Sequence, residues 1–351
     1  MTPSLIIKLR PTSPWRIGSG PARESVDLVY HSDTLYSAVT LTMQQLGWLE
    51  DWLRATAGSE EPAVRFTSCY PFVDDTLFIA PPRNLWPPPS SARVRWKSAR
   101  FVPLSLVVHL AKDAEARVRE DEGWTVDAES ECLLPAPGGR RMRPPLRLGT
   151  RRTVAVDRLT GVTSEPSIAG CLEFTAGCGL WLGVAYSSEE AAAQWDSRVR
   201  ACFRLLSDNG FGGQRSRGFG RAEAPEFVEN AFPDLGIRTD SAAAPEAEAQ
   251  EPAAPVEQAY WLLSLYAPGP DDQVDWSRGA YALVNRGGRV DSAARAGESK
   301  RSLQMVAEGS VVFARKPPRG TVSDVAPAEF PHPVYRAGYA VGVPIAWRVL
   351  A

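Results

Sequence analysis

The chain has 351 residues, enough for two domains of ordinary size that each bury a hydrophobic core. Its 44% hydrophobic and 23% charged residues are typical of a folded protein in water and exclude a chain that is disordered throughout. The longest mostly apolar stretch without charge, 101–111, is too short to cross a bilayer, and Lys8 and Arg10 interrupt the apolar N-terminal stretch. We therefore expect a cytoplasmic protein with neither a signal peptide nor a membrane partner.

The distribution of charge is more informative than its sum. The net charge of −2 and the pI of about 6.1 by themselves argue against a nucleic-acid binder. However, 140–158 holds seven arginines and one acidic residue, 278–319 is also strongly basic, and 226–257 holds eight acidic residues and one arginine. This pattern indicates a basic body with an acidic connector, and a basic strip can follow a phosphate backbone. A solvated surface without a ligand is the alternative.

The five cysteines indicate neither disulfides nor a zinc site, because their number is odd and no pair has CxxC spacing. We expect them to be reduced and mostly buried. The adjacent acidic pairs at 74–75, 189–190 and 271–272 are better explained as turn or cap residues than as metal ligands. We therefore expect no metal and no cofactor.

The first predicted elements are a strand and a helix. Ser4 to Arg10 alternates loosely, with apolar residues at 5, 7 and 9 on one face and basic residues at 8 and 10 on the other, which indicates a strand. After a loop rich in glycine and proline, Ser32 or Asp33 is predicted to cap a helix. Its apolar residues repeat at helical spacing, at Leu35, Val39, Met43, Leu46, Leu49 and Leu53. The helix N-terminus, from His31 to Thr34, is a candidate anion site because its amide N–H groups are unpaired; capping alone is an equal alternative.

The segment 58–170 gives the weakest structural signals, because prolines are dense within it. We expect the arginine-rich part through Arg158 to form a loop or hairpin inserted into the first domain. Short strands are predicted within and after this segment, at 76–79, 104–110, 172–174 and 180–185.

Ser187 to Leu206 predicts a second helix, with Ser187 or Ser188 as its N-cap and Gly210 just beyond its end. The stretch 209–221 follows directly and holds five glycines and three arginines. Glycines let another molecule approach the bare main chain, and arginines supply forked donors, a combination that suits a phosphate backbone. An edge strand is predicted to begin within 219–228.

The position of this glycine-rich loop excludes two common phosphate-binding motifs. A P-loop and a dinucleotide-binding fingerprint both need a strand before the glycines and a helix after them, and here the order is reversed. No Lys-Ser or Lys-Thr follows the glycines, and their spacing is not GxGxxG. A surface loop without a ligand remains the alternative interpretation.

The stretch 230–257 is acidic and rich in alanine, proline and glutamate, so it cannot bury enough apolar surface to fold alone. We interpret it as a linker between an N-terminal domain, 1–229, and a smaller C-terminal domain, 258–351. Strand-like segments in the second domain are predicted at 260–266, 280–284, 310–314 and 338–350.

Four motifs carry a resemblance to a known family: 31–38 (HSDTLYSA), 152–161 (RTVAVDRLTG), the loop 209–221 and 332–339 (HPVYRAGY). In this order they resemble the RAMP superfamily of CRISPR-associated RNA-binding proteins, and within it the type III-A (Csm) subunit that holds the 5′ tag of the CRISPR RNA. The resemblance implies an α+β fold with two ferredoxin-like (RRM-like) domains, the first with a large arginine- and proline-rich insertion at about 58–170. In this family such an insertion acts as a thumb lying against the RNA.

The resemblance implies a non-catalytic subunit that binds the CRISPR RNA and joins the large palm-domain subunit to the backbone RAMP subunit, with target RNA as an indirect partner. The predicted RNA-binding residues are Ser32, Asp33, Thr34, Arg151, Arg152, Arg158, Gly210, Gly212, Gly213, Arg215, Ser216, Arg217, Gly218, Arg221 and Arg336. Nearby aromatic residues could stack on unpaired bases, although a place in the hydrophobic core is the more ordinary role; they are Trp15, Tyr36, Phe211, Phe219 and Tyr335.

Two other functions stay open. His31 lies near the first helix, where RNA-cleaving relatives keep a general acid or base, so a CRISPR-RNA-processing endoribonuclease is the main alternative. Against it, the Asp33 carboxylate would repel a phosphate. A further possibility is an assembly scaffold whose basic surface meets an acidic protein face.

Overall fold

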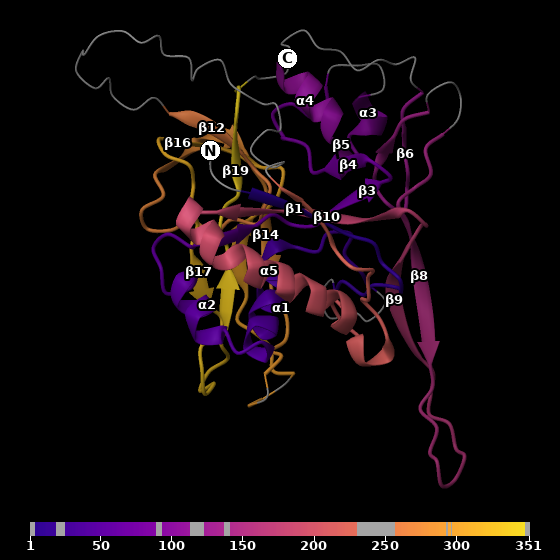
Figure 1. Cartoon of the computed structure of the whole chain (residues 1–351). Helices are drawn as coiled ribbons and strands as arrows, with labels where there is room; N and C mark the ends of the chain where they lie inside the picture. Colours follow the sequence, from indigo (N-terminus) through magenta and orange to yellow (C-terminus); the bar gives the residue numbers. More distant parts are fainter. Residues whose placement is uncertain are drawn as a thin grey trace, which may run out of the picture.

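The structure is a computed structural model, and it combines helices and sheets as an α+β fold, as predicted (Figure 1). The residues that it describes are 4–18, 25–88, 93–112, 123–136, 141–229, 257–292, 294–295 and 297–347. Most of the acidic stretch 230–257 lies outside these ranges, so its predicted role as a linker stays a prediction.

A seven-stranded sheet forms the centre of the N-terminal part, with strand order β11-β1-β10-β3-β4-β5 and β2 also paired with β10. Every pair is antiparallel, and Leu5 of β1 lies opposite Val184 of β10. The strands are β1 (Ser4–Leu9), β2 (Val64–Phe66), β3 (Tyr70–Val73), β4 (Thr76–Ile79), β5 (Val102–Pro103), β10 (Cys178–Tyr186) and β11 (Glu226–Glu229). The predictions of β1, β4, β10 and the edge position of β11 are confirmed.

Helices α1 (Ser32–Gln45), α2 (Leu49–Ala55) and α5 (Glu189–Asn209) belong to this part of the chain. Figure 1 shows α1 and α5 on the same side of β1 and β10. The sequence predicts α1 and α2 as one helix, but Gly47 lies between them with φ of +78°, a left-handed conformation that ends α1. The predicted cap is also wrong, because the N-cap residue is His31, whose carbonyl oxygen accepts from the N–H groups of Thr34 and Leu35.

The ends of α5 agree with the prediction. The Ser188 side chain accepts a hydrogen bond from the Ala191 N–H at 3.2 Å, and Gly210 ends the helix with φ of +95°. The buried face carries Trp195, Val199 and Phe203, spaced as one side of a helix.

Parts of 58–170 depart from the predictions. Strands β2, β3 and β4 belong to the central sheet, so the beginning of this segment contributes to the first domain itself. The strand predicted at 104–110 is wrong, because these residues form helix α4 (Leu104–Lys112). Leu106, Val107, Leu110 and Ala111 are its buried residues, and their spacing is that of one helix face. Short elements nearby are α3 (Arg93–Trp96), β6 (Thr125–Val126) and β7 (Leu133–Leu134).

The arginine-rich segment forms a hairpin, one of the two forms expected for it. Strands β8 (Leu146–Thr153) and β9 (Ser167–Phe174) pair along their whole length, from Leu146 opposite Phe174 to Thr153 opposite Ser167. The hairpin continues past the strands, since Ala155 O accepts from Ser164 N–H at 2.9 Å. Figure 1 shows it extending well beyond the body of the protein.

The C-terminal part is built on a four-stranded antiparallel sheet with order β13-β16-β12-β19. Its strands are β12 (Gln258–Leu262), β13 (Val274–Ala280), β16 (Val311–Ala314) and β19 (Gly342–Ile345). Two hairpins connect them, β14 (Leu283–Arg286) with β15 (Leu303–Val306), and β17 (Val322–Asp324) with β18 (Tyr335–Ala337). The predicted strand segments each overlap one of these strands, except that 280–284 spans the end of β13 and the start of β14.

The two parts share one hydrophobic core rather than touching at a surface. Trp261 and Leu263 from the C-terminal part are fully buried in the same cluster as β1 and β10. The indole N–H of Trp261 donates to Ala80 O at 3.1 Å, and the Tyr70 hydroxyl donates to Leu263 O at 2.7 Å. All five cysteines are free and buried, as predicted. Among the described helices, none is long and apolar enough to cross a membrane.

Candidate nucleic-acid interface

A short segment near the N-terminus holds the glycine-rich loop against the base of the hairpin. The backbone N–H of Trp15 donates to Leu172 O on β9 at 2.9 Å, and the backbone N–H of Gly213 donates to Arg16 O at 2.8 Å. The rings of Trp15 and Phe211 stack, with centroids 4.9 Å apart. The hairpin motif 152–161 and the glycine-rich loop 209–221 are separated in the sequence, and these contacts bring the two elements together.

The glycines of the loop have two different roles. A Cβ on Gly210 would lie 2.5 Å from Phe219 O, and one on Gly212 would lie 2.4 Å from Arg16 O, so both positions are required by the loop's own packing. Gly218 has φ of +82° with open space around it, and Gly213 is exposed. Gly213 and Gly218 are therefore accessible, whereas Gly210 and Gly212 are occupied by the packing of the protein, and contact of Gly213 and Gly218 with a ligand stays a prediction.

The loop directs polar side chains outward through a short 3-10 turn at Arg215–Arg217. Ser216, Arg217 and Arg221 are exposed. Arg217 Nη1 donates to Thr153 Oγ1 at the end of β8 at 3.1 Å, which links the loop to the hairpin. Arg215 is half-buried, and its Nη2 lies 2.8 Å from Asp291 Oδ2 in the C-terminal part.

The hairpin carries both paired and unpaired arginines. Glu173 Oε1 lies 2.5 Å from Arg151, and its Oε2 lies 2.7 Å from Arg147. The side chains of Arg152 and Arg158 are exposed and make no ion pair with any residue that the structure describes. The unpaired charges therefore sit on the outer half of the hairpin.

The hairpin tip is apolar as well as basic. Asp157 Oδ1 accepts from the N–H groups of Leu159 and Thr160, which closes the turn. Leu159 is 97% exposed, and Val154, Val156 and Val162 are also exposed. Exposed apolar side chains concentrated on one projecting element mark an interaction site.

The aromatic residues considered for base stacking are mostly in the core. The rings of Trp15, Tyr36, Phe211 and Phe219 are buried, so they are not available to a base, and Tyr335 alone of this set is half-buried. Trp15 and Phe211 instead pack the loop against the body.

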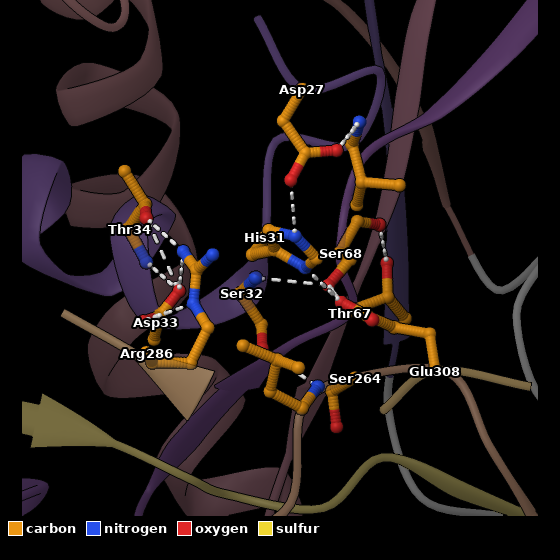
Figure 2. Close-up of polar contacts among 12 residues, drawn as sticks. Asp27, His31, Ser32, Asp33, Thr34, Thr67, Ser68, Ser264, Arg286 and Glu308 are labelled. Atoms are coloured by element: carbon orange, nitrogen blue, oxygen red, sulfur yellow. Dashed lines mark hydrogen bonds and ion pairs between the residues drawn. The ribbon is translucent and has the colours of Figure 1, made fainter. Parts of the chain in front are cut away.

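The N-terminus of α1 is not a surface but the centre of a buried polar cluster (Figure 2). His31 is 4% exposed and lies between two carboxylates, with Nδ1 2.7 Å from Glu308 Oε1 and Nε2 3.0 Å from Asp27 Oδ2. Burial would lower the pKa of His31, but Glu308 and Asp27 raise it to about 9. His31 is therefore a buried imidazolium that donates from both ring nitrogens at neutral pH.

Ser32 joins the two parts of the chain. Its backbone N–H donates to Ser68 Oγ at 2.9 Å, and its own Oγ accepts from the Leu265 N–H at 3.0 Å. Ser68 Oγ in turn donates to Glu308. Every polar atom named here is satisfied by the protein itself.

Asp33 is held by two arginines from the C-terminal part. Arg286 donates from Nε to Oδ2 at 3.1 Å and from Nη2 to Oδ1 at 3.0 Å, and Arg336 Nη1 donates to Oδ2. Burial would raise the pKa of Asp33, but the two arginines hold it well below its usual value. Figure 2 shows Arg286 contacting both Asp33 and the Thr34 side chain.

This geometry changes the interpretation of four predicted site residues. The side chains of His31, Ser32, Asp33 and Arg336 are buried and engaged by the protein, because they join the two halves of the chain. The expected repulsion of a phosphate by Asp33 does not arise, since two arginines neutralise it. Thr34 is half-buried at the edge of the cluster. A general acid or base at His31 would have no access to a phosphate, so the endoribonuclease alternative is not supported.

The residues that complete these arrangements carry no local signal in the sequence. Glu308 and Arg336 lie 277 and 303 positions from their partners His31 and Asp33. Asp291 stands between Arg289 and Arg295, and a carboxylate in a basic stretch is the signal that could have identified it as a counter-ion, whereas Glu173 has no basic residue near it in the sequence. Among the described residues, no group of three or more His, Cys, Asp or Glu side chains could hold a metal ion.

Comparison with known proteins gives one family-model match and several structural matches. Residues 256–345 match the family model of the CRISPR Csm4 C-terminal domain. A chain in the crystal structure of a Csm3–Csm4 subcomplex of the type III-A CRISPR–Cas interference complex has a TM-score of 0.61 and 16% identity, over 97% of this chain and 99% of that one. A chain in a Csm1–Csm4 cassette with cA4 has a TM-score of 0.55 and 17% identity, over 99% of both chains.

The resemblance predicted from the four motifs is confirmed by these matches: the C-terminal region matches the Csm4 model, and the whole chain shares its fold with chains of type III-A complexes. At 16–17% identity the structural likeness shows the fold. No curated protein sequence gives a match.

Proposed function

We propose that this chain is a non-catalytic, cytoplasmic RNA-binding subunit of a type III-A CRISPR effector complex, and that it holds the 5′ repeat-derived tag of the CRISPR RNA. The observation that carries the proposal is the convergence of the glycine-rich loop and the arginine hairpin on one surface through Trp15 and Arg16. Exposed arginines are the donors that position a phosphate backbone, and glycines without a side chain let that backbone come close.

The topology supports two RAMP-type domains. In each sheet the first strand lies between the last strand and the third, as β11-β1-β10 and as β19-β12-β16. In the first part, α1 and α5 connect the strands as in a ferredoxin-like βαββαβ unit. In the second part, the β17–β18 hairpin occupies the place of the second helix and the connection from β12 to β13 holds no helix, which fits a reduced version of the same unit.

The partners in this proposal are the CRISPR RNA, a backbone RAMP subunit and the large palm-domain subunit, with target RNA contacted indirectly. Solved complexes that pair Csm4 with Csm3 and with Csm1 support the two protein partners. The RNA contact surface comprises Thr34, Gly213, Ser216, Arg217, Gly218 and Arg221, with Arg152 and Arg158 on the hairpin and Arg151 and Arg215 behind their counter-ions.

The test is a salt titration of binding to a 5′-labelled, single-stranded tag RNA, measured by fluorescence anisotropy. The double variant Arg152→Ala/Arg217→Ala removes two exposed charges and should weaken binding and reduce the slope of log K against log salt by about 1.4. The matched control Arg54→Ala/Lys316→Ala also removes two exposed charges, at positions outside the hairpin and the glycine-rich loop. It should leave the slope close to that of the wild type.

An unchanged slope in the first double variant would contradict the proposed surface. Crosslinking of the RNA 5′ end in the co-purified complex gives a second check, with crosslinks expected in the peptides 146–174 and 209–221. RNA products that disappear with His31→Ala would indicate the nuclease instead, and no RNA retained at low salt would indicate a protein scaffold.

A further inference from the structure

The ion pair between Arg215 and Asp291 connects the proposed RNA surface to the C-terminal part. Arg215 belongs to the glycine-rich loop, and Asp291 belongs to the segment after β14. Their side chains are 38% and 66% exposed, and Arg215 Nη2 lies 2.8 Å from Asp291 Oδ2. The guanidinium group of Arg215, a predicted RNA-binding residue, therefore already binds the Asp291 carboxylate in the protein without RNA.

Lys300 lies in the same connection between β14 and β15 as Asp291 and interacts electrostatically with its carboxylate. Its side chain is half-buried and makes no hydrogen bond or ion pair with the residues that the structure describes. Burial and the nearby Arg336 lower the pKa of Lys300, whereas Asp33 and Asp291 oppose that shift. Lys300 is thus a cation in an electropositive site, where Asp291 is the exposed negative charge.

We propose that Arg215 and Lys300 form a subsite for one phosphodiester group of the RNA, and that the Asp291 carboxylate occupies this subsite until the RNA displaces it. The proposal rests on the proposed function, because it assigns an internal competitor to the same RNA surface. The carboxylate stands in for the phosphate: both present oxygens with a delocalised negative charge to an arginine fork.

The two acidic residues near the subsite differ in whether a ligand could displace them. Asp33 is enclosed by Arg286 and Arg336 and is inaccessible, so it stays in place and fixes these arginines. Asp291 is exposed and holds a single arginine, and an exposed ion pair contributes little free energy. A phosphate carried in by an RNA that also contacts Arg217 and the hairpin would therefore replace Asp291 easily.

With Asp291 as an internal competitor, the subsite should bind the phosphates of an RNA chain in preference to single anions. A lone phosphate gains only the subsite and must still displace Asp291, whereas an RNA gains all the other contacts at the same time. The carboxylate also reduces the attraction of Arg215 for other polyanions before the correct RNA is seated.

The experiment compares Asp291→Asn with the wild type in the same anisotropy salt titration. Removing the competitor should tighten RNA binding by up to about fivefold, the factor that an exposed ion pair represents. It should also steepen the salt slope by about 0.7, since one more phosphate contact then occurs with net ion release. Lys300→Met removes the charge and keeps an unbranched aliphatic side chain, and it should weaken binding and reduce the slope by a similar amount.

Glu298→Gln is the matched control. It removes one negative charge from the same segment, but Glu298 pairs with Arg295 at 3.8 Å rather than with the glycine-rich loop. Its effect on affinity should be much smaller than that of Asp291→Asn. Thermal unfolding of each variant identifies any loss of folded protein.

Unchanged or weaker binding by folded Asp291→Asn would overturn the counter-ion role and leave the proposed function intact. If the wild-type protein itself binds no tag RNA, both proposals fail. Equal gains from Asp291→Asn and Glu298→Gln would also overturn the subsite, because they would show a general effect of net charge.

Discussion

Two acidic residues in this protein face arginines in opposite ways, and the contrast separates its framework from its surface. Asp33 has a fully buried side chain and accepts from Arg286 and Arg336, whereas the side chain of Asp291 is 66% exposed and, among the described residues, accepts from Arg215 alone. The chemistry of the two contacts is the same. The difference teaches that burial decides whether a carboxylate fixes the structure or serves as a replaceable counter-ion.

The same contrast applies to the two motifs that the sequence presents as anion sites. The motif at 31–34 lies inside the protein and joins its two halves, while the loop at 209–221 presents exposed arginines beside a projecting hairpin. A helix N-terminus and a glycine-rich loop are thus both candidate anion sites in the sequence, but only the loop lies at the surface of the described structure.

The largest expected effect comes from removing each carboxylate charge in turn. Asp33→Asn leaves two arginines buried without a counter-charge, so it should destabilise the protein by about 3–5 kcal/mol. Asp291→Asn removes an exposed pair and should change the free energy of unfolding by less than about 1 kcal/mol. Urea unfolding of both variants measures the difference in the free energy of unfolding. Similar decreases in the two variants would contradict the different roles given to the buried and the exposed carboxylate.

The pH dependence of stability tests the interior arrangement alone. The pKa of His31 rises from 6.5 to about 9 on folding, so its stabilising contribution is fully present below pH 6.5 and is lost as the pH rises through about 9. The expected loss is about 3 kcal/mol. His31→Gln should show a flatter profile over this window.

The measurement is the free energy of unfolding at a series of pH values for both proteins. Burial raises the pKa of Cys69, so both proteins also lose stability at alkaline pH for that reason. The difference between the two curves therefore isolates His31. Parallel curves would show that His31 is not charged in the folded protein.

The smallest expected effect distinguishes two neighbouring arginines on β8. Successive side chains on a strand point to opposite faces, so Arg151 and Arg152 would reach an RNA from opposite faces of β8, and one of them should contribute more than the other. Arg151 is paired with Glu173 at 2.5 Å, whereas Arg152 makes no ion pair within the described part of the chain. Arg152→Ala should lower the salt slope of RNA binding by about 0.7, and Arg151→Ala by less. The reverse ranking would place the RNA on the other face of the hairpin.

Local patterns were sufficient to predict the elements whose signals lie within a few residues. The alternation in β1, the apolar run of β10 and the Ser188 cap of α5 are all set by neighbouring side chains. The helix at 104–112 was missed because a short apolar run fits a strand or a helix equally well until its buried face is known. The break at Gly47 was missed because apolar spacing continued across it.

The candidate site was predictable in its exposed parts and not in its interior. The arginines and glycines of 209–221 and the basic hairpin are visible as local composition. The burial of His31 and Asp33 depends on Glu308, Arg286 and Arg336, which tertiary folding brings from more than 250 positions away. No local pattern encodes such a contact, so side chains that complete the framework resembled ligand-binding residues.

The separation of Asp33 and Arg336 in the sequence also determines when their contact can form during synthesis of the protein. Asp33 leaves the ribosome 303 residues before this partner, which at about 5–20 residues per second is a delay of roughly 15–60 s. Throughout that interval the first sheet lacks the strands that complete its core, and its apolar surface is open to other nascent chains. Contact with chaperones during synthesis is therefore expected until the C-terminal sheet has formed, because Asp33 and Arg336 lie 303 positions apart in the sequence.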